Sequence, residues 1–318
     1  MSNLLVLGGS GFVGSVLCER LVRRASGGSG RITVPSRRPG RARHLQTLPT
    51  VEVVAADLHD DAQLARLVAG RDAVINLVAI LHGGAGDFER VHVALPRRLA
   101  DSCLAAGVSR LVHVSALGAD AQGPSMYLRS KGAGELALQG AGLATTVLRP
   151  SVIFGPGDSF LNLFARMQAV LPFVPLAGAD ARFQPVWVDD VAEAIARTLD
   201  RPDTAGLTLE CVGPTVYTLA DLVRLAGRWS GHQRPVLPLP NAVGRLQARV
   251  MQWLPGDPLM SLDNMDSMKA PNVASGSHPG LGHLGIEPIA LEAIAPGMLA
   301  DDGEMSHMNR RRAAGHGG

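Results

Sequence analysis

The first 24 residues contain a strand, a glycine-rich turn and a helix in direct succession, and this order restricts the fold of the whole chain. Residues 4–7 are an apolar run typical of a buried strand, and residues 13–24 carry apolar side chains at helical spacing. Between them lies Gly8-Gly9-Ser10-Gly11-Phe12-Val13-Gly14. Such a turn presents backbone N–H groups at a helix N-terminus, where they bind a pyrophosphate. The segment therefore predicts the first βα unit of a dinucleotide-binding sheet.

The glycine spacing alone is weak support for this interpretation. Glycine is abundant, with 37 among 318 residues, so the triple spacing is expected about 0.5 times by chance in such a chain. The position of the turn between a strand and a helix carries the inference.

The rest of the N-terminal half repeats the alternation of strand and helix. Further strands are predicted at residues 32–34, 51–55, 73–78, 111–114 and 145–148. These runs are almost continuously apolar, so helices should cover both faces of the sheet. We expect an α/β fold, a Rossmann doubly wound parallel sheet with a smaller C-terminal cap domain.

The rhythm changes after Pro150, which suggests a division of the chain. We expect a dinucleotide-binding Rossmann domain at 1–155 and a disordered tail at 298–318. Residues 156–297 should be a mixed region that returns to the Rossmann core near 183–212 and otherwise forms a cap for a substrate or partner. Within it, Ser159 is predicted to cap a helix that Pro172 ends, and residues 270–285 should form coil.

The composition is that of an ordinary globular protein and argues against other classes. The chain is 46% apolar and 18% charged with a net charge of +2, which does not predict nucleic acid as a partner. The longest charge-free apolar stretch, residues 167–179, is too short to cross a bilayer. Cys18, Cys103 and Cys211 are far apart, so we expect no disulfide framework and no metal site. A cytoplasmic location is expected.

The residues after the second predicted strand indicate which dinucleotide binds. An acid there would accept the ribose hydroxyls of NAD, but this chain has Ser36, Arg37 and Arg38. Guanidinium groups suit a 2′-phosphate, so NADP(H) is preferred and NAD(H) is the alternative. In an arginine-rich chain these side chains could also form only a solvated loop. Asp57, after the third strand, either holds the adenine amine or caps the next helix.

Tyr127 and Lys131 are separated by one helical turn, which puts the phenol and the ammonium on one face. The chain has only two tyrosines and two lysines, so this spacing is expected about 0.01 times by chance. A phenol with a pKa near 10 needs a neighbouring cation to act as an acid or base at neutral pH. Ser115, at the end of the preceding strand, is placed to orient a substrate carbonyl.

Taken together, these features resemble the short-chain dehydrogenase/reductase superfamily in its extended or atypical branch. More narrowly, the chain resembles bacterial relatives of the NADPH-binding accessory subunit of respiratory complex I. The resemblance spans about residues 4–273 and is carried by residues 73–78, 88–93, 110–120, 148–156, 182–192, 257–259 and 263–265.

The resemblance implies a set of site residues. Ser115, Tyr127 and Lys131 would form the catalytic constellation, and Lys131 would also bond the nicotinamide ribose. The expected cofactor-binding positions are Gly8, Ser10, Gly11, Phe12, Val13, Gly14, Ser36, Arg37, Arg38, Asp57, Leu58, Leu77, Ala79, Lys131 and Pro150. Two positions depart from the superfamily pattern, since Ala79 stands where glycine is usual and His92 where the asparagine of a proton-relay tetrad is usual.

The resemblance also implies a function. The chain is expected to be an NAD(P)H-binding member of the complex I accessory-subunit family, with a nucleotide that is structural or slowly turned over. Its partner would be complex I or a quinone, and it would lie free in the cytoplasm or peripherally on the cytoplasmic face of the inner membrane. Two alternatives stay open: a soluble NADP-dependent reductase or epimerase, in which Tyr127 passes a proton and NADPH gives hydride, and a factor in ubiquinone metabolism.

Two further features have ordinary structural explanations. Asp189 and Asp190 are expected to cap a helix at residues 191–199, and Trp187 should lie in the core. The apolar segment 160–175 is either core packing or a docking surface for a substrate tail, a quinone or a partner.

Overall fold

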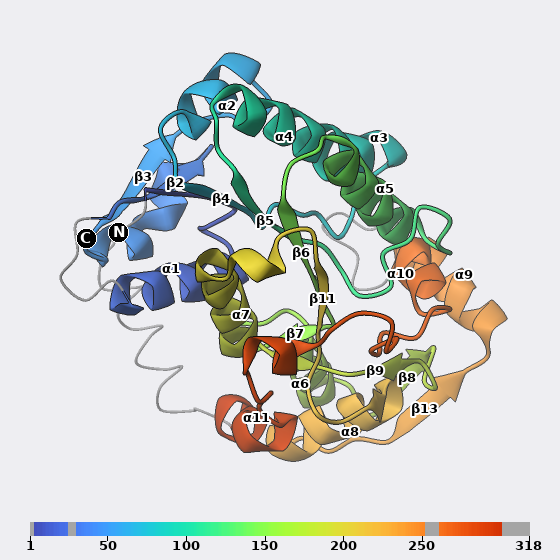
Figure 1. The fold of residues 1–318 in the computed structure, drawn as a ribbon. Helices are drawn as coiled ribbons and strands as arrows, with labels where there is room; N and C mark the ends of the chain where they lie inside the picture. Colours follow the sequence, from blue (N-terminus) through green and yellow to red (C-terminus); the bar gives the residue numbers. More distant parts are fainter. Residues whose placement is uncertain (1–2, 25–29, 252–260, 301–318) are drawn as a thin grey trace.

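The computed structural model describes residues 3–24, 30–251 and 261–300, and a seven-stranded parallel sheet forms its centre (Figure 1). The strand order is β11-β6-β5-β4-β1-β2-β3. The strands are β1 (Leu4–Leu7), β2 (Ile32–Ser36), β3 (Val51–Ala55), β4 (Ala73–Asn76), β5 (Arg110–Val114), β6 (Thr145–Pro150) and β11 (Thr208–Cys211). The order reverses between β1 and β4, which is the doubly wound arrangement, so the expected fold class is confirmed.

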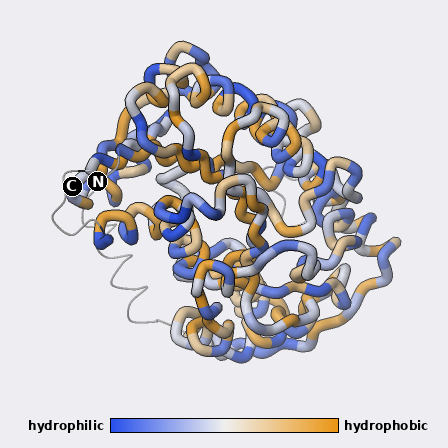
Figure 2. Tube along the Cα trace, viewed as in Figure 1, coloured by the Kyte–Doolittle hydropathy of each residue, from blue (hydrophilic) through white to orange (hydrophobic). Residues whose placement is uncertain are grey.

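Helices cover both faces of this sheet, as the apolar strands predicted. One face carries α1 (Phe12–Arg24) and α7 (Val188–Asp200); the other carries α2 (Asp61–Val68), α4 (Leu95–Ala105) and α5 (Met126–Gly140) (Figure 1). Every residue of β1 and β4 is buried. Figure 2 shows apolar residues concentrated along the central strands.

The predicted strands agree with the observed ones in position but not always in length. β4 ends at Asn76, two residues early, because the Asn76 side chain accepts a hydrogen bond from the Val78 N–H at 3.1 Å and turns the chain. β2 and β6 each continue two residues further than expected.

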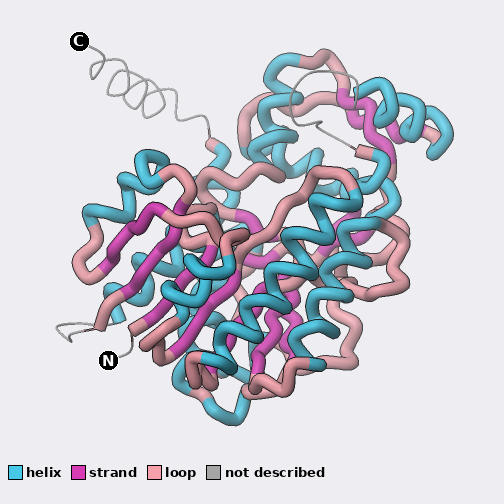
Figure 3. Tube along the Cα trace, turned by 90° about the horizontal axis from the view of Figure 1, so that it is seen from above, coloured by secondary structure: helices cyan, strands magenta, loops and turns pink. Residues whose placement is uncertain are grey.

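The remaining elements lie mostly to one side of the sheet, where Figures 1 and 3 show a smaller cap. The cap is built from β8 (Val174–Ala177), β13 (Val236–Leu239), α6 (Leu161–Val170), α8 (Leu219–Trp229), α9 (Asn241–Met251), α10 (Leu262–Ser267) and α11 (Leu291–Leu299). The other short elements are the strands β7 (Ile153–Phe154), β9 (Arg182–Phe183), β10 (Val186–Trp187) and β12 (Tyr217–Thr218), the helix α3 (Ala85–Phe88), and the turns η1 (Pro39–Thr47), η2 (Glu89–Ala94), η3 (Pro202–Thr204) and η4 (Leu281–Leu284).

The apolar segment 160–175 is divided between core and surface. Phe164 is buried in the cap, and Phe160 packs against it with ring centroids 5.2 Å apart. Phe173 is 45% exposed and Val170 is 82% exposed. Trp187 is buried, as expected.

Two helix caps differ from the prediction. Asp158, not Ser159, caps α6, because its buried carboxylate accepts the N–H groups of Phe160 and Leu161, both at 2.8 Å. α7 begins at Val188, so Asp189 and Asp190 lie inside its first turn and do not cap it. Their charges still oppose the positive end of the helix dipole.

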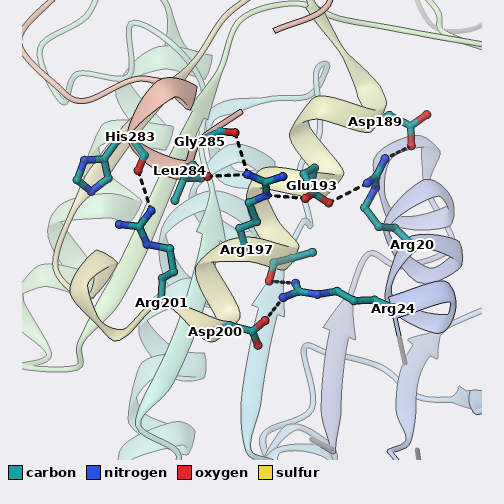
Figure 4. A network of polar contacts seen from close by, with 11 residues as sticks. Arg20, Arg24, Asp189, Glu193, Arg197, Asp200, Arg201, His283, Leu284 and Gly285 are labelled. Atoms are coloured by element: carbon teal, nitrogen blue, oxygen red, sulfur yellow. Dashed lines mark hydrogen bonds and ion pairs between the residues drawn. The ribbon is translucent and has the colours of Figure 1, made fainter. Parts of the chain in front are cut away.

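The C-terminal part of the chain crosses the surface and is fastened by arginines (Figure 4). Arg197 donates to the carbonyl oxygens of Leu284 and Gly285, and Arg201 donates to that of His283. Of the coil predicted at residues 270–285, residues 270–280 form turns and coil, but Leu281–Leu284 form the 3-10 turn η4. α11 continues to Leu299, so the expected tail boundary at 298 is too early. Residues 301–318 and the 257–259 segment lie outside the described residues.

The packing of α5 generates a first prediction. A Cβ at Gly134 would overlap the carbonyl oxygen of His92, whereas one at Gly140 on the same helix would meet nothing within 4 Å. We expect Gly134→Ala to lower the free energy of unfolding by about 3 kcal/mol through overpacking. Gly140→Ala should change it by less than about 1 kcal/mol, on the stabilising side. Urea denaturation followed by circular dichroism measures both, and equal values for the two variants would contradict the close packing.

Candidate functional site

The glycine turn forms a compact cradle at the start of α1. Gly8 has a φ of +78°, a conformation that favours glycine, and its carbonyl oxygen accepts the Gly11 N–H at 3.0 Å. A Cβ at Gly14 would lie 2.5 Å from that same oxygen, so the helix can begin this close to the turn only with glycine there. Gly11 is exposed, which leaves its backbone accessible to a ligand.

The cradle lies at the point where the strand order reverses. β1 and β4 are neighbours, and the residues after β4 run beside the glycine turn: the Leu77 N–H donates to Leu7, and a Cβ at Gly8 would lie 3.1 Å from the Leu77 carbonyl carbon. Ala79 is exposed just beyond. Open α/β sheets bind ligands in the crevice at this reversal. The structure thus brings the expected positions Gly8 to Gly14, Leu77 and Ala79 together.

The polar positions expected to select the nucleotide follow the next two strands. Arg37 and Arg38 are exposed at the end of β2, and in the described ranges neither guanidinium has an ion-pair partner. The Ser36 hydroxyl accepts the Arg38 N–H at 3.2 Å. Asp57 is exposed after β3 and accepts the His59 N–H, while Asp60 caps α2. The alternative that Asp57 caps that helix is therefore wrong.

Ser115 and the Lys131 amine lie at the carboxyl end of β5, and Tyr127 lies one helical turn before Lys131 on α5. The side chain of Ser125 caps α5 by accepting the Leu128 N–H, and the helix then carries Tyr127 and Lys131 one turn apart. The Lys131 amine is buried and donates to the Val114 carbonyl oxygen at 2.9 Å. Ser115 follows directly, and its buried hydroxyl has no hydrogen-bond partner among the described residues. Buried polar groups are normally paired, so this hydroxyl is suited to a bound ligand.

Burial sets the protonation states of this site. It raises the pKa of Tyr127 to about 12, and it lowers the pKa of Lys131 to about 8 against the opposing charge of Glu135. The expectation that Lys131 brings the phenol into the neutral range is not what the structure shows, because desolvation dominates. At neutral pH the Tyr127 phenol therefore keeps its proton.

Two contributors to the site were missed by the sequence analysis. Glu135, one turn beyond Lys131, is buried and held by Arg149 through bonds of 3.0 Å from Nε and 2.6 Å from Nη2. The carboxylate of Asp263 accepts the N–H groups of Met126 and Tyr127 at 2.6 and 3.0 Å. The helical spacing of Lys131 and Glu135 was a readable signal. Asp263 was noted only as part of the family resemblance at residues 263–265, and no local pattern connects it to α5, which lies more than 130 residues away in the chain.

The described residues show neither a metal site nor a membrane span. No three His, Cys, Asp or Glu side chains gather closely enough in them to hold a metal ion. None of the helices in these ranges is both long and apolar enough to cross a bilayer.

The lowered pKa of Lys131 makes stability depend on pH. The folded-state pKa is about 8 and the ordinary value is 10.5, so between these values the unfolded chain binds more protons. The contribution of Lys131 to the free energy of unfolding should therefore rise with pH, by on the order of 2 kcal/mol between pH 8 and 10. Denaturation of wild type and Lys131→Met across this range measures it. Lys269→Met, at the exposed lysine, should keep the wild-type slope of the free energy of unfolding against pH. If Lys131→Met also kept the wild-type slope, the lowered pKa of Lys131 would be refuted.

Comparisons with known proteins agree with this geometry. The family model described as "NAD dependent epimerase/dehydratase family" matches residues 4–209. The mitochondrial NADH dehydrogenase (ubiquinone) 1 alpha subcomplex subunit 9 of Rattus norvegicus is 31% identical over 294 residues, covering 90% of this chain and 77% of the relative. Ceramide reductase of Caulobacter vibrioides is 31% identical over 193 residues, 60% of each chain.

A similar fold is found in a solved structure. That of a dTDP-glucose 4,6-dehydratase from Streptomyces venezuelae with NAD bound has a TM-score of 0.64 at 22% identity, covering 84% of this chain and 96% of that one. At this identity the likeness shows the fold alone, whereas the family match extends over most of the chain. This protein belongs to the NAD-dependent epimerase/dehydratase family, in the extended branch of the short-chain dehydrogenase/reductase superfamily.

Proposed function

We propose that this protein holds NADP(H) as a structural or slowly turned-over ligand and acts as an accessory or assembly partner of respiratory complex I. The observation that carries the proposal is a contrast within the site. The glycine cradle is complete, while the usual relay asparagine is replaced by His92, and the pKa of Tyr127 is raised to about 12. The similarity to complex I subunits over 90% of this chain supports the partner. Its place would be peripheral, on the cytoplasmic face of the membrane that holds the complex.

Each part of the dinucleotide has a proposed site. The pyrophosphate would lie on the turn from Gly8 to Gly14, and a 2′-phosphate would lie near Ser36, Arg37 and Arg38. Lys131 would bond the nicotinamide ribose. The other proposed contacts are Ser10, Gly11, Phe12 and Val13 at the cradle, Asp57 and Leu58 after β3, Leu77 and Ala79 after β4, and Pro150 at the end of β6.

A second candidate is a soluble reductase, and the buried Ser115 hydroxyl, which has no hydrogen-bond partner in the described part of the chain, favours it. Ser115 would orient a substrate carbonyl, and the neutral phenol of Tyr127 would donate a proton to its oxygen. Bound NADPH would supply the hydride. An epimerase would use the same residues.

The nucleotide preference is tested by titration. NADPH should bind at least about 10-fold more tightly than NADH, because the guanidinium groups of Arg37 and Arg38, which form no ion pair with the described residues, lie at the end of β2. Arg37→Ala combined with Arg38→Ala should remove the difference by weakening NADPH alone. The charge-matched control removes two exposed arginines of α2 and α4, as Arg66→Ala with Arg97→Ala. This variant should keep the difference between the NADPH and NADH affinities. Quenching of protein fluorescence gives the affinities, and equal wild-type affinities would refute the preference.

The partner role is tested by native-gel migration of the tagged protein from gently solubilised membranes, with bound nucleotide identified by mass. We expect co-migration with the large NADH:quinone oxidoreductase. Tyr127→Phe should leave both migration and nucleotide content unchanged, because the phenol would not be needed for binding. Gly11→Val, whose side chain would fill the space above the cradle, should lose both. A small soluble wild-type species, with carbonyl reduction abolished by Tyr127→Phe, would instead support the reductase.

A further inference from the structure

His92 lies in a π-helical turn, η2, that joins α3 to α4. Its side chain is only 2% exposed. The wide turn pushes the His92 carbonyl oxygen against α5, at the position where only glycine, Gly134, fits. Single π-helical turns are frequent at functional sites. Here the turn places one imidazole between the loop after β4 and the helix that carries Tyr127.

The hydrogen bonds of this imidazole have one possible direction. The Ile80 backbone N–H lies 3.0 Å from Nε2 and can only donate, so Nε2 is the unprotonated nitrogen. The proton of the neutral ring is then on Nδ1, which donates to the Ser130 hydroxyl at 2.8 Å. The Ser130 hydroxyl in turn donates to the Tyr127 carbonyl oxygen at 2.8 Å. The chain of bonds runs from the backbone of Ile80 to the backbone of Tyr127.

The ring is neutral and fixed on its other sides. Burial and the charge of Lys131 lower the pKa of His92 to about 3. The Tyr127 ring lies edge-on to the imidazole with centroids 5.6 Å apart, and the Phe88 ring lies at 5.5 Å. A chain that begins at an amide N–H and ends at a carbonyl oxygen does not pass protons at neutral pH. Its effect is therefore on position.

We propose that His92 is a positioning residue that links the loop after β4 to helix α5 by hydrogen bonds, so that nucleotide binding and the placement of Tyr127 are coupled. We call this chain of hydrogen bonds the clasp. The coupling to nucleotide rests on the proposed function, in which Leu77 and Ala79 of this loop contact the dinucleotide. The clasp itself, from Ile80 through His92 and Ser130 to Tyr127, stands without it.

Hydrogen exchange of the Ile80 amide in nucleotide-free protein tests the clasp. His92→Phe keeps a ring between Phe88 and Tyr127 but removes both hydrogen bonds, and should speed exchange at Ile80 by about 10-fold or more. Ser130→Ala should also speed it, although Ser130 does not touch Ile80. His92→Gln, whose amide again offers an acceptor and a donor, should restore most of the protection. Ser102→Ala, which removes a similar serine bond within α4, should leave Ile80 unchanged.

NADPH affinity tests the coupling. His92→Phe should raise the Kd for NADPH about 10-fold, and Ser130→Ala should also raise it. The double variant should bind NADPH no more weakly than His92→Phe alone, because both substitutions break the same chain of hydrogen bonds. Lower thermal stability with unchanged Ile80 exchange and unchanged Kd would overturn the proposal.

The failure of the nucleotide proposal is separable from the failure of the clasp. If wild type does not bind NADPH, the proposed function is wrong, while the exchange data still decide the clasp. If His92→Phe does not fold, Ser130→Ala and His92→Gln carry the same comparison. An unchanged rate of hydrogen exchange at the Ile80 amide in Ser130→Ala would then contradict the clasp.

Discussion

The ammonium group of Lys131 is buried at the carboxyl end of β5, and much of the surrounding structure accommodates it. A buried charge is tolerated only where polar partners replace lost water. The Val114 carbonyl oxygen is one partner, and Glu135 places a negative charge one turn along α5. Arg149 in turn satisfies Glu135 from β6. Removing Glu135 would leave the Lys131 ammonium without a nearby negative charge, and removing Arg149 would leave the Glu135 carboxylate without its partner, so these residues form a unit between the helix and the sheet.

The C-terminal part of the chain completes the site from the other side. Asp263 of α10 caps the first turn of α5, and Ser267 donates a hydrogen bond to the capping residue Ser125. Asn272 accepts the Val152 N–H just after β6. The cap therefore contributes to the position of Tyr127 and Lys131, and a disturbance in α10 would reach Tyr127 through the N-terminus of α5.

Local patterns were enough to predict the sheet and the cradle, because apolar runs, helical spacing and glycine turns act within a few residues. They were not enough where neighbours compete or distant segments meet. Ser159 and Asp158 are adjacent candidates for one cap, and only the three-dimensional turn selects Asp158. The pKa of Tyr127 depends on how deeply α5 is packed, which spacing does not reveal. The bonds from Asp263 to α5 join segments that no short pattern connects.

The scarcity of lysine has a practical consequence for chemistry on this protein. Of the two lysines, Lys269 has a side chain that is 62% exposed, while the amine of Lys131 is enclosed. An amine-reactive reagent should therefore modify a single lysine in the native state. Lys131 would become reactive only when α5 separates from β5, because only then does its amine meet the reagent; exposure to water would also return its pKa toward the ordinary value of 10.5. Acylation of Lys131 would thus report whether α5 is packed on β5 or separated from it.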